Sequence, residues 1–517
     1  MMDQRFDTII IGAGLAGLTA GALLASDEKQ KILVLEKESY VGGRLLSFQV
    51  KKNRFLLQGQ KLSVEEFNKA MGSVYAWVTF AQPALETMLD AELLDGFSFE
   101  AGGHATFWGT RGRVGCLLDY LQKPVPLPGN KGFSVIDVET YRLHPMEKGG
   151  SYGWMSESSN RTAKKLLREM ITAIPEDLNS WDQISFGTWL NDRTDDRKVY
   201  EFLAAIASIH MVMGEPDMIP AGDFIRFMRT AADIGMNLIS GSTGIVPAPG
   251  FVYLGERIAE KITENDGVIK TNAAVTEILF EGERAVGVRA KTSDGEKAFY
   301  ADHIVCTVPI RKIWSFLPKH HFPQSLVEKV EKDYFSVGML TGYVGLRCDI
   351  LADAGIDGKS WVLVPSILKA EEGFIGDVDI VSIMPSNFEP SLAPEGKFTI
   401  AYSIALTDSE LRNKEKVHQV INTARQIFHK TFPQMKENTI WEIWTCSDKG
   451  FGDWPPPGER RPDTTQPTMK GVFFAGDGYG AKTWGSGMDA AVHSGILCVD
   501  SITGGNYLEK VMPPYHR

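Results

Sequence analysis

The feature that most constrains this chain is a glycine-rich turn close to its N-terminus. Residues 7–11 form a short run rich in isoleucine, the pattern of a strand that is buried on both faces. GAGLAG follows at 12–17, and a helix-forming segment runs from 15 to about 25. The order of strand, glycine turn and helix predicts a nucleotide-binding unit.

Each glycine of this turn has a separate physical role. Gly12 permits the tight turn, Gly14 lets a pyrophosphate approach the backbone, and Gly17 lets the helix and strand pack closely. The first helical residues, Leu15 and Ala16, present their N–H groups to the negative charge. Such a turn is a weak signal alone, so further residues are needed to identify the ligand.

An acidic residue after the second strand supplies the next constraint. The strand over 31–35 ends at Glu36, about 20 residues beyond the glycines, and Lys37 follows. A carboxylate at this place accepts hydrogen bonds from the ribose of an adenosine and repels a 2′-phosphate. The pattern predicts a dinucleotide and leaves nicotinamide and flavin open.

A second glycine pair closes the N-terminal stretch. Gly42 and Gly43 let the chain pass close to a cofactor, and Arg44 offers a forked, permanently charged group that suits phosphate. The residues themselves indicate only a second phosphate contact. The complete string of GxGxxG, Glu36 and GGR resembles the signature of the FAD-dependent amine oxidase and phytoene desaturase superfamily. That resemblance implies a FAD-dependent oxidoreductase.

Two further segments extend the resemblance. In GFSFEAGGH, at 96–104, it implies that Gly102 and Gly103 lead into the flavin site and that His104 lies near the isoalloxazine. His104 is the one catalytic candidate, because a histidine can titrate near neutral pH and assist proton movement. A local hydrogen bond is the alternative. In the block at 244–309, the resemblance implies that the backbone of Val275 contacts the adenine.

The C-terminal block has the same order of strand, glycine-rich turn and helix as the N-terminal stretch. It reads GVFFAGDGYGAKTWGSGMDAA. An apolar strand runs into Gly476 and Asp477, and a glycine-rich loop enters a helix at about Gly487, whose N–H groups can face the reduced flavin. The resemblance implies that Asp477 bonds the ribityl or phosphate region. It places Met488 and Asp489 by the pyrimidine edge.

The chain contains one dinucleotide fingerprint. No second GxGxxG follows a predicted strand, so an NAD(P)H domain is not expected, and oxygen, a quinone or a redox protein remains open as the electron acceptor. Relatives with covalent flavin place a cysteine shortly before Pro-Pro-Gly. Here Cys446 stands several residues too early and Gly450 is nearer that step, so we expect non-covalent FAD.

Composition excludes several classes of function. The net charge is −11, with 43% hydrophobic and 23% charged residues, and no cluster of Lys and Arg is dense enough for nucleic acid. No apolar run approaches the roughly 18 residues of a spanning helix, so a cytoplasmic protein is expected, with peripheral membrane contact left open. Five scattered cysteines without CxxC spacing argue against a disulfide framework and a zinc site, so no metal is expected.

The segments between the cofactor blocks should choose the substrate. The stretch 202–239 is rich in methionine and aromatic residues and suits an apolar cavity, although core packing explains each residue equally well. NFEPSLAPEGKFTIAY, at 387–402, resembles a PxGK stretch of the phytoene desaturase, carotenoid isomerase and retinol saturase branch. This segment favours that branch over the amine oxidases.

An inserted amphipathic helix is predicted over about 63–80. Ser63 and Glu66 have capping-box spacing, and apolar residues recur on one helical face through Val78. Three interpretations compete: packing on its own domain, a lid or dimer contact, and a membrane-surface helix. Lys69 is its one basic residue, and surface helices display several, so the membrane interpretation is the weakest.

These observations predict an α/β fold with two interleaved domains. A Rossmann-like FAD-binding domain, with a mostly parallel sheet and helices on both faces, is expected from 1–115, 244–310 and 455–517. An α+β substrate domain with a mixed sheet is expected from 116–243 and 311–454. The active site should lie at their junction.

The preferred function is hydride transfer to or from carbon of a hydrophobic, polyene- or isoprenoid-like substrate, by a desaturase, saturase or isomerase. The alternative is a flavin amine oxidase that uses oxygen, in which Trp444, Trp454, Tyr479 and Trp484 are candidates to flank the flavin. A third hypothesis is a non-catalytic flavoprotein subunit.

Overall fold

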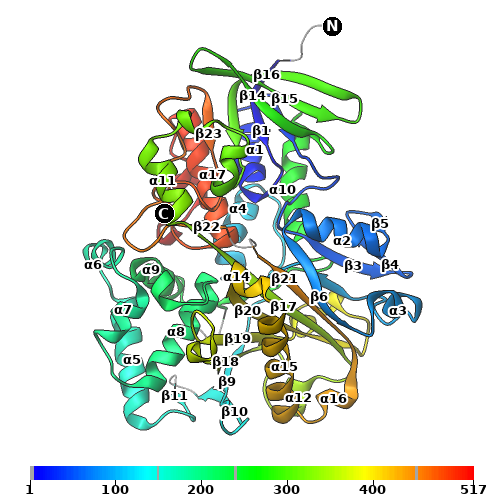
Figure 1. Ribbon diagram of the computed structural model, residues 1–517, viewed down its shortest axis with the longest axis vertical. Coiled ribbons are helices and arrows are strands. Elements are labelled where there is room, and N and C mark those ends of the chain that lie inside the picture. Colours follow the sequence, from blue (N-terminus) through cyan, green and yellow to red (C-terminus); the bar gives the residue numbers. More distant parts are fainter. Residues whose placement is uncertain (1–4, 148–150, 238–240, 449–451, 517) are drawn as a thin grey trace.

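The computed structural model describes residues 5–147, 151–237, 241–448 and 452–516. Figure 1 shows two lobes, with the two chain ends both in the upper one. Gly450 and residues 238 and 239 lie outside the described residues, so the expectations placed on them are not addressed. Among the described helices, none is both long and apolar enough to cross a membrane.

The upper lobe is built on a seven-stranded sheet in the order β13-β2-β1-β16-β15-β14, with β23 beside β16. The five strands β13, β2, β1, β16 and β23 run parallel, and β15 and β14 continue the sheet as antiparallel strands. Their bounds are β1 (Arg5–Ile11), β2 (Ile32–Leu35), β13 (Val268–Lys270), β14 (Ala274–Glu281), β15 (Arg284–Thr292), β16 (Gly295–Cys306) and β23 (Val472–Phe474).

Helices cover both faces of this sheet. On one face lie α1 (Leu15–Ser26), α4 (Arg113–Tyr120), α10 (Val252–Glu264), α17 (Gly487–Thr503) and α18 (Tyr507–Val511). The other face packs against α11 (Gln324–Lys332) and the 3₁₀ turns before it. Ile9 and Ile10 are both fully buried on opposite faces, because successive side chains of a strand alternate. The Rossmann-like class is confirmed.

The lower lobe contains a ten-stranded mixed sheet in the order β11-β10-β9-β18-β19-β20-β17-β21-β6, with β22 beside β17. All its pairs are antiparallel except β9 with β18. The bounds are β6 (Ala76–Gln82), β9 (Gly132–Ile136), β10 (Leu143–Glu147), β11 (Ser151–Tyr152), β17 (Phe335–Leu346), β18 (Ser360–Leu368), β19 (Val378–Ile383), β20 (Phe398–Thr407), β21 (Thr439–Ser447) and β22 (Asp453–Trp454).

Two groups of helices cover this mixed sheet. On the face away from the upper lobe lies α15 (Lys414–Thr431), with α12 (Ile350–Asp353), α14 (Asp408–Arg412) and α16 (Met435–Asn438) nearby. The other group is α5 (Glu157–Ile171), α6 (Pro175–Trp181), α7 (Phe186–Asn191), α8 (Arg197–Met211) and α9 (Ala221–Asp233), of which α8 packs over β18, β19 and β20.

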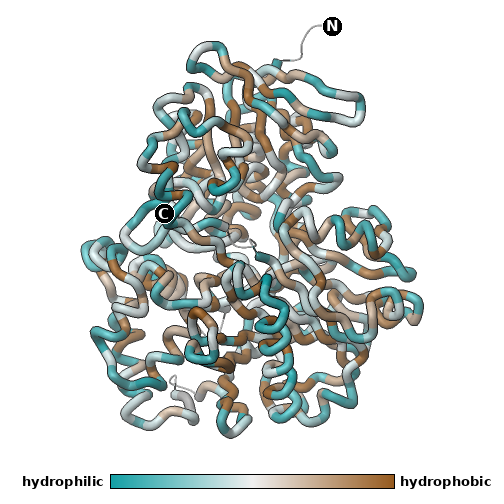
Figure 2. Tube along the Cα trace, viewed as in Figure 1, coloured by the Kyte–Doolittle hydropathy of each residue, from teal (hydrophilic) through white to brown (hydrophobic). Residues whose placement is uncertain are grey.

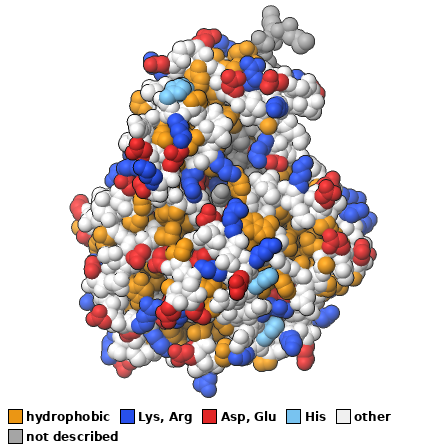
Figure 3. Space-filling view, viewed as in Figure 1, with side chains coloured by type: hydrophobic (Ala, Val, Ile, Leu, Met, Phe, Trp, Pro, Cys, Tyr) orange, Lys and Arg blue, Asp and Glu red, His pale blue; other side chains and the backbone are white. Residues whose placement is uncertain are grey.

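Figure 2 shows hydrophobic residues concentrated on the inner strands, and Figure 3 shows basic and acidic side chains interspersed on the visible face.

A small four-stranded sheet, β5-β4-β3-β7, projects to one side. It is covered by α2 (Val64–Ser73), whose Phe67 is fully buried and stacks on Phe55 with ring centroids 4.0 Å apart. The strands are β3 (Ser47–Lys51), β4 (Arg54–Leu57), β5 (Gln60–Leu62) and β7 (Ser98–Glu100), and α3 (Leu85–Asp90) precedes β7. The apolar face of α2 therefore packs on the chain's own sheet, which favours the first of the three interpretations.

The helix predicted over 63–80 is correct in its first half and wrong in its second. The capping box of Ser63 and Glu66 is present, but the helix ends at Ser73, and β6 begins at Ala76. Val78 pairs with Thr445 of β21, which is far away in the sequence. Pairing with this distant strand overrides the local helical pattern. As a result β6 belongs to the lower sheet.

Candidate functional site

A cavity of about 720 Å³ runs between the upper and lower sheets. It brings together most of the site residues predicted from the sequence. Those that line it are Gly12, Gly14, Leu15, Ala16, Glu36, Lys37, Gly43, Arg44, Gly102, Gly103, His104, Val275, Gly476, Asp477, Gly487 and Met488. Gly17 and Asp489 do not line it.

The N-terminal turn has the geometry of a phosphate cradle. Gly12 has φ +99°, and a Cβ added there would lie 2.5 Å from Oγ1 of Thr307. A Cβ at Gly17 would lie 2.3 Å from the carbonyl oxygen of Gly12, so Gly17 holds α1 against the turn from behind. At Gly14 the same position is open space within 4 Å, on the cavity side. No side chain caps the N-terminus of α1, so its amides can face a ligand.

Glu36 lies at the end of β2 and is 6% exposed. Its carboxylate accepts hydrogen bonds from the backbone N–H groups of Ala13 at 2.7 Å and Glu38 at 2.9 Å. Burial raises the pKa of Glu36 and outweighs these two bonds, which act in the opposite direction. The side chain thus ties the glycine turn to the second strand and borders the cavity.

Arg44 connects the N-terminal and C-terminal cofactor segments. Its Nη2 donates to Oδ2 of Asp477 at 2.7 Å, and the Asp477 side chain is nearly buried. Gly43 has φ +57°, and a Cβ there would lie 3.2 Å from Cα of Gly14, so the two N-terminal glycine turns touch. These contacts place the N-terminal and C-terminal cofactor segments around one cavity.

Two buried arginines support the loop that leads into α17. Arg113 donates to the carbonyl oxygens of Trp484 at 2.9 Å and His516 at 3.1 Å, and Arg461 donates to that of Gly485 at 2.8 Å. Burial lowers the pKa of Arg113 to about 10. Sequence reasoning missed both arginines, because each acts through backbone carbonyls that no sequence motif marks.

Asp489 also supports the loop that leads into α17, and it does not line the cavity. Its Oδ1 accepts from the backbone N–H of Arg113 at 3.2 Å. Burial raises the pKa of Asp489 to about 6, against the opposing effect of Arg113. Gly487 and Met488, which directly precede Asp489, do line the cavity, and among the described residues no side chain caps this helix either.

The far end of the cavity is a chamber between α8 and the lower sheet. Its apolar lining residues are Phe107, Ile209, Val212, Met339, Trp361, Val381, Ile383 and Ala405. Its polar lining includes His104, Ser403 and Ser486, and the hydroxyl of Ser486 donates to the carbonyl oxygen of His210 at 3.3 Å. Of the residues 202–239 proposed from sequence for such a cavity, Ile209 and neighbouring Val212 line it.

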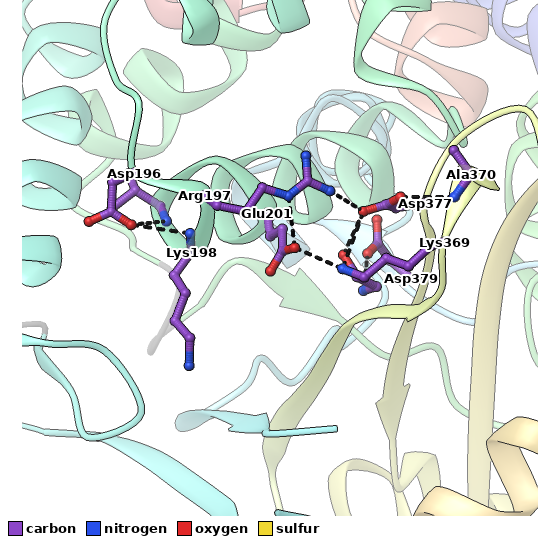
Figure 4. Close-up of polar contacts among 10 residues, drawn as sticks. Asp196, Arg197, Lys198, Glu201, Lys369, Ala370, Asp377 and Asp379 are labelled. Atoms are coloured by element: carbon purple, nitrogen blue, oxygen red, sulfur yellow. Dashed lines mark hydrogen bonds and ion pairs between the residues drawn. The ribbon is translucent and has the colours of Figure 1, made fainter. Parts of the chain in front are cut away.

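An ionic network joins the start of α8 to the segment between β18 and β19 (Figure 4). Arg197, at the start of α8, donates to Glu201 at 2.9 Å and to Asp377 at 2.7 Å. Lys369 contacts the same Glu201 at 2.7 Å. Asp377 and Lys369 come from the segment between β18 and β19. Ile209, near the other end of α8, and Val212, directly after it, line the chamber, so this helix connects the network to the chamber.

His104 is buried and lies 3.4 Å, measured from Nδ1, from the hydroxyl oxygen of Ser403. Burial lowers the pKa of His104 to about 3. The imidazole is therefore neutral at physiological pH. Desolvation thus moves the pKa of His104 away from the near-neutral range expected from the sequence.

The aromatic candidates for a flavin-flanking pair are divided. Tyr479 lines the cavity, and its hydroxyl donates to the carbonyl oxygen of Val308 at 3.0 Å. Trp444, Trp454 and Trp484 do not line it. Trp444 packs on Tyr402 on the opposite face of the lower sheet, and Trp484 lies beneath the guanidinium of Arg113.

No cysteine lines the cavity. Cys446 is fully buried in β21, and the other four cysteines lie elsewhere in the described chain. Within the described ranges no group of three or more His, Cys, Asp or Glu side chains could hold a metal ion.

Comparison with known proteins agrees with this geometry. Among solved structures, an oxidoreductase from Methanosarcina mazei has a TM-score of 0.66 at 18% identity and covers 97% of this chain and 100% of its own. A protein from Pyrococcus furiosus has a TM-score of 0.64 at 18% identity, covering 99% and 100%. Cyclohexylamine oxidase from Brevibacterium oxydans has a TM-score of 0.61 at 15% identity, covering 96% and 99%. At these identities the likeness shows the fold. No curated protein sequence matches the chain.

Fold and cavity together define a dinucleotide-dependent oxidoreductase with two glycine cradles around one cofactor. The family model for flavin containing amine oxidoreductases matches residues 15–503, and the chain belongs to that family. It is a FAD-dependent oxidoreductase. The open space at Gly14, the uncapped helix termini and the buried acid at Glu36 fit the phosphates and ribose of FAD.

Proposed function

We propose that this enzyme transfers hydride to or from carbon of an uncharged, largely apolar substrate, such as a polyene or isoprenoid. The observation that carries the proposal is the distribution of charge along the cavity. The carboxylates, ammonium groups and guanidinium that line it are Glu36, Lys37, Glu38, Arg44, Lys312 and Asp477, all on segments that follow the upper sheet or the cofactor turns. The chamber offers His104 alone, which is neutral.

A charged substrate would be poorly accommodated in this chamber. A buried ammonium or carboxylate loses several kcal/mol of hydration, to order of magnitude, unless an opposite charge meets it. Among the described residues that line the chamber, none carries a charge at neutral pH. Apolar walls such as Trp361, Val381 and Ile383 gain free energy when they cover hydrocarbon instead.

The residues at the other end of the cavity would hold the cofactor. We assign the backbone at Gly12, Gly14, Leu15 and Ala16 to the pyrophosphate, with Arg44 beside it. Glu36 and Lys37 would bind the ribose, Val275 the adenine, and Asp477 the ribityl chain. Gly43, Gly102, Gly103 and Gly476 would let the backbone approach the cofactor, and Gly487 and Met488 would meet the pyrimidine edge. Gly17 and Asp489 do not line the cavity and would support the cofactor-binding residues from the side away from the cofactor.

FAD supplies the acceptor and donor of hydride when it is bound. The chain's own residues orient the substrate and exclude water. The packing of α8 on β18, β19 and β20 would keep this helix over the chamber, so that a bound hydrocarbon lies between the helix and the sheet. The cysteines all lie away from the cavity, which supports non-covalent FAD. The electron acceptor would be oxygen, a quinone or a redox protein.

The second candidate is an amine oxidase that uses oxygen. Membership of the flavin containing amine oxidoreductase family favours it, and Tyr479 supplies one aromatic ring at the cavity. Trp444, Trp454 and Trp484 do not line the cavity, whereas Phe107 and Trp361 add aromatic rings to the chamber. The absence of charge among the described residues that line the chamber supports the first candidate over the second.

Anaerobic titration of the FAD-loaded protein separates the candidates. Uncharged polyenes should bleach the oxidised flavin, or reoxidise the reduced flavin, whereas simple amines should do neither. Bleaching by amines alone, with peroxide formed on admission of oxygen, would show the amine oxidase. Absence of any response in either direction would show a non-catalytic flavoprotein.

A further inference from the structure

The chamber contains one polar spot, formed by residues far apart in the sequence. His104 follows β7, and Ser403 lies in the middle of β20. Both side chains line the cavity, and both are at least nine-tenths buried, with 7% and 9% exposure. The surrounding lining of Val381, Ile383 and Ala405 is apolar. The two side chains therefore concentrate hydrogen-bonding capacity at one place.

Part of that capacity is unused. The contact between His104 and Ser403 occupies Nδ1, and Nε2 of His104 has no hydrogen-bond partner among the residues that the structure describes. Thr341, the register partner of Ser403 across β17 and β20, has a buried Oγ1 without a partner among those residues, but it does not line the cavity. The free capacity that a ligand in the cavity can use is therefore that of His104, whose neutral imidazole keeps one nitrogen to donate or to accept a hydrogen bond.

The nearby Tyr343 does not compete for this ligand. Its ring packs edge-on to His104 with centroids 6.2 Å apart, and its hydroxyl accepts from the backbone N–H of Glu100 at 3.1 Å. The polar spot consequently consists of the neutral imidazole of His104 and the hydroxyl group of Ser403.

We propose that His104 and Ser403 bind a neutral oxygen atom, a hydroxyl or a carbonyl, on the otherwise apolar substrate. This inference rests on the proposed function and narrows its substrate to oxygen-bearing hydrophobic molecules. A neutral imidazole has one donor and one acceptor nitrogen. When Ser403 donates to Nδ1, Nε2–H is left to donate to a carbonyl; when Nδ1–H donates to Ser403, Nε2 is left to accept from a hydroxyl.

The pair acts as a specificity determinant. An apolar pocket discriminates weakly against a molecule that adds a hydroxyl, whereas a site built to bond an oxygen rejects the analogue that lacks it. One hydrogen bond between neutral groups corresponds to a preference of about tenfold. The preference should therefore be measurable by binding alone, without turnover.

The test uses the FAD-loaded full chain and a series of cyclohexyl compounds that differ in one group. Cyclohexane, cyclohexanol, cyclohexanone, cyclohexanecarboxylate and cyclohexylamine are titrated while the flavin absorption spectrum is recorded. Cyclohexanol or cyclohexanone should bind about tenfold tighter than cyclohexane. Cyclohexanone binding tighter than cyclohexane would indicate that Nε2 carries the proton, whereas a preference for cyclohexanol alone would indicate that Nε2 accepts.

Variants then assign the preference to the pair. Ser403→Ala and His104→Leu should bring the oxygenated probes to the affinity of cyclohexane, while His104→Gln should retain part of the preference. Ser382→Ala is the matched control, because Ser382 lies on the neighbouring strand β19, is fully buried and does not line the cavity. It should leave all affinities unchanged.

Equal affinity of the wild type for cyclohexane and its oxygenated analogues would overturn this inference and leave the proposed function standing. Tightest binding of cyclohexylamine would overturn both. Loss of affinity for all probes together in the His104 and Ser403 variants would show that the pair only shapes the chamber. A spectral shift of the ligand-free flavin in His104→Leu, with the oxygen preference intact, would assign His104 to the cofactor instead.

Discussion

Replacing Gly14 by alanine should weaken FAD binding without destabilising the cofactor-free protein. Gly14 has φ −75° and ψ 172°, a conformation open to any residue, and a Cβ there meets no atom within 4 Å. The stability of the cofactor-free protein should therefore change by less than about 0.5 kcal/mol. The added methyl group projects into the cavity, where we place the pyrophosphate.

The expected loss of FAD affinity follows from the packing of the added methyl group. Its effect on the free energy of unfolding follows from the coupling between FAD binding and folding. A methyl group forced into a filled site costs about 1–3 kcal/mol, and the upper end applies because neither the turn nor a pyrophosphate can move aside. This corresponds to roughly 100-fold weaker binding. At a FAD concentration 100 times the wild-type Kd, FAD stabilises the wild type by about 2.7 kcal/mol and Gly14→Ala by only about 0.4 kcal/mol.

Thermal unfolding with and without FAD measures both quantities, with Gly17→Ala as the contrast. A Cβ at Gly17 would lie 2.3 Å from the carbonyl oxygen of Gly12 and 3.0 Å from Cγ2 of Ile10, so this variant should lose about 1–3 kcal/mol even without cofactor. The reasoning is refuted if Gly14→Ala binds FAD like the wild type, or if it destabilises the cofactor-free protein as much as Gly17→Ala does.

Three further outcomes are expected. Phe67→Ala should cost about 3–5 kcal/mol in thermal or denaturant unfolding, because the ring is fully buried against Phe55, whereas Lys69→Ala on the exposed side of α2 should change stability by less than about 0.5 kcal/mol. Burial raises the pKa of Asp379 to about 8 from 3.8, so the folded protein keeps a proton that the unfolded chain releases, and stability falls as pH rises between these values. Asp379→Asn should accordingly melt higher than the wild type at about pH 8, with a smaller gain at about pH 5; equal shifts at both would contradict the assignment. Acid precipitation should release all the yellow chromophore into the supernatant, and colour retained in the pellet would show a covalent flavin.

The cofactor half of the fold could be predicted because its signals are local. The predicted strand at 7–11, helix from 15 and strand at 31–35 correspond to β1, α1 and β2. The glycine turn directly follows one buried strand and opens a helix, and Glu36 directly follows the next strand, about 20 residues on. The same holds for the C-terminal block, where the helix begins at Gly487 as expected.

The remaining features depend on contacts between distant segments. The strand β6 could not be predicted because its identity comes from pairing with β21, more than 350 residues later. The partner of His104 is Ser403, 299 residues away, and a single serine within a buried strand carries no sequence signal. Arg113 and Arg461 were missed for the same reason, since their partners are backbone carbonyls.

The most direct test of the central claim is a crystal structure of the protein reconstituted with FAD. The account predicts the pyrophosphate against Gly14, the pyrimidine edge at Gly487 and Met488, and the chamber beside His104 and Ser403 left open for substrate. A flavin ring that fills this chamber, or a dinucleotide bound outside the cavity, would contradict it.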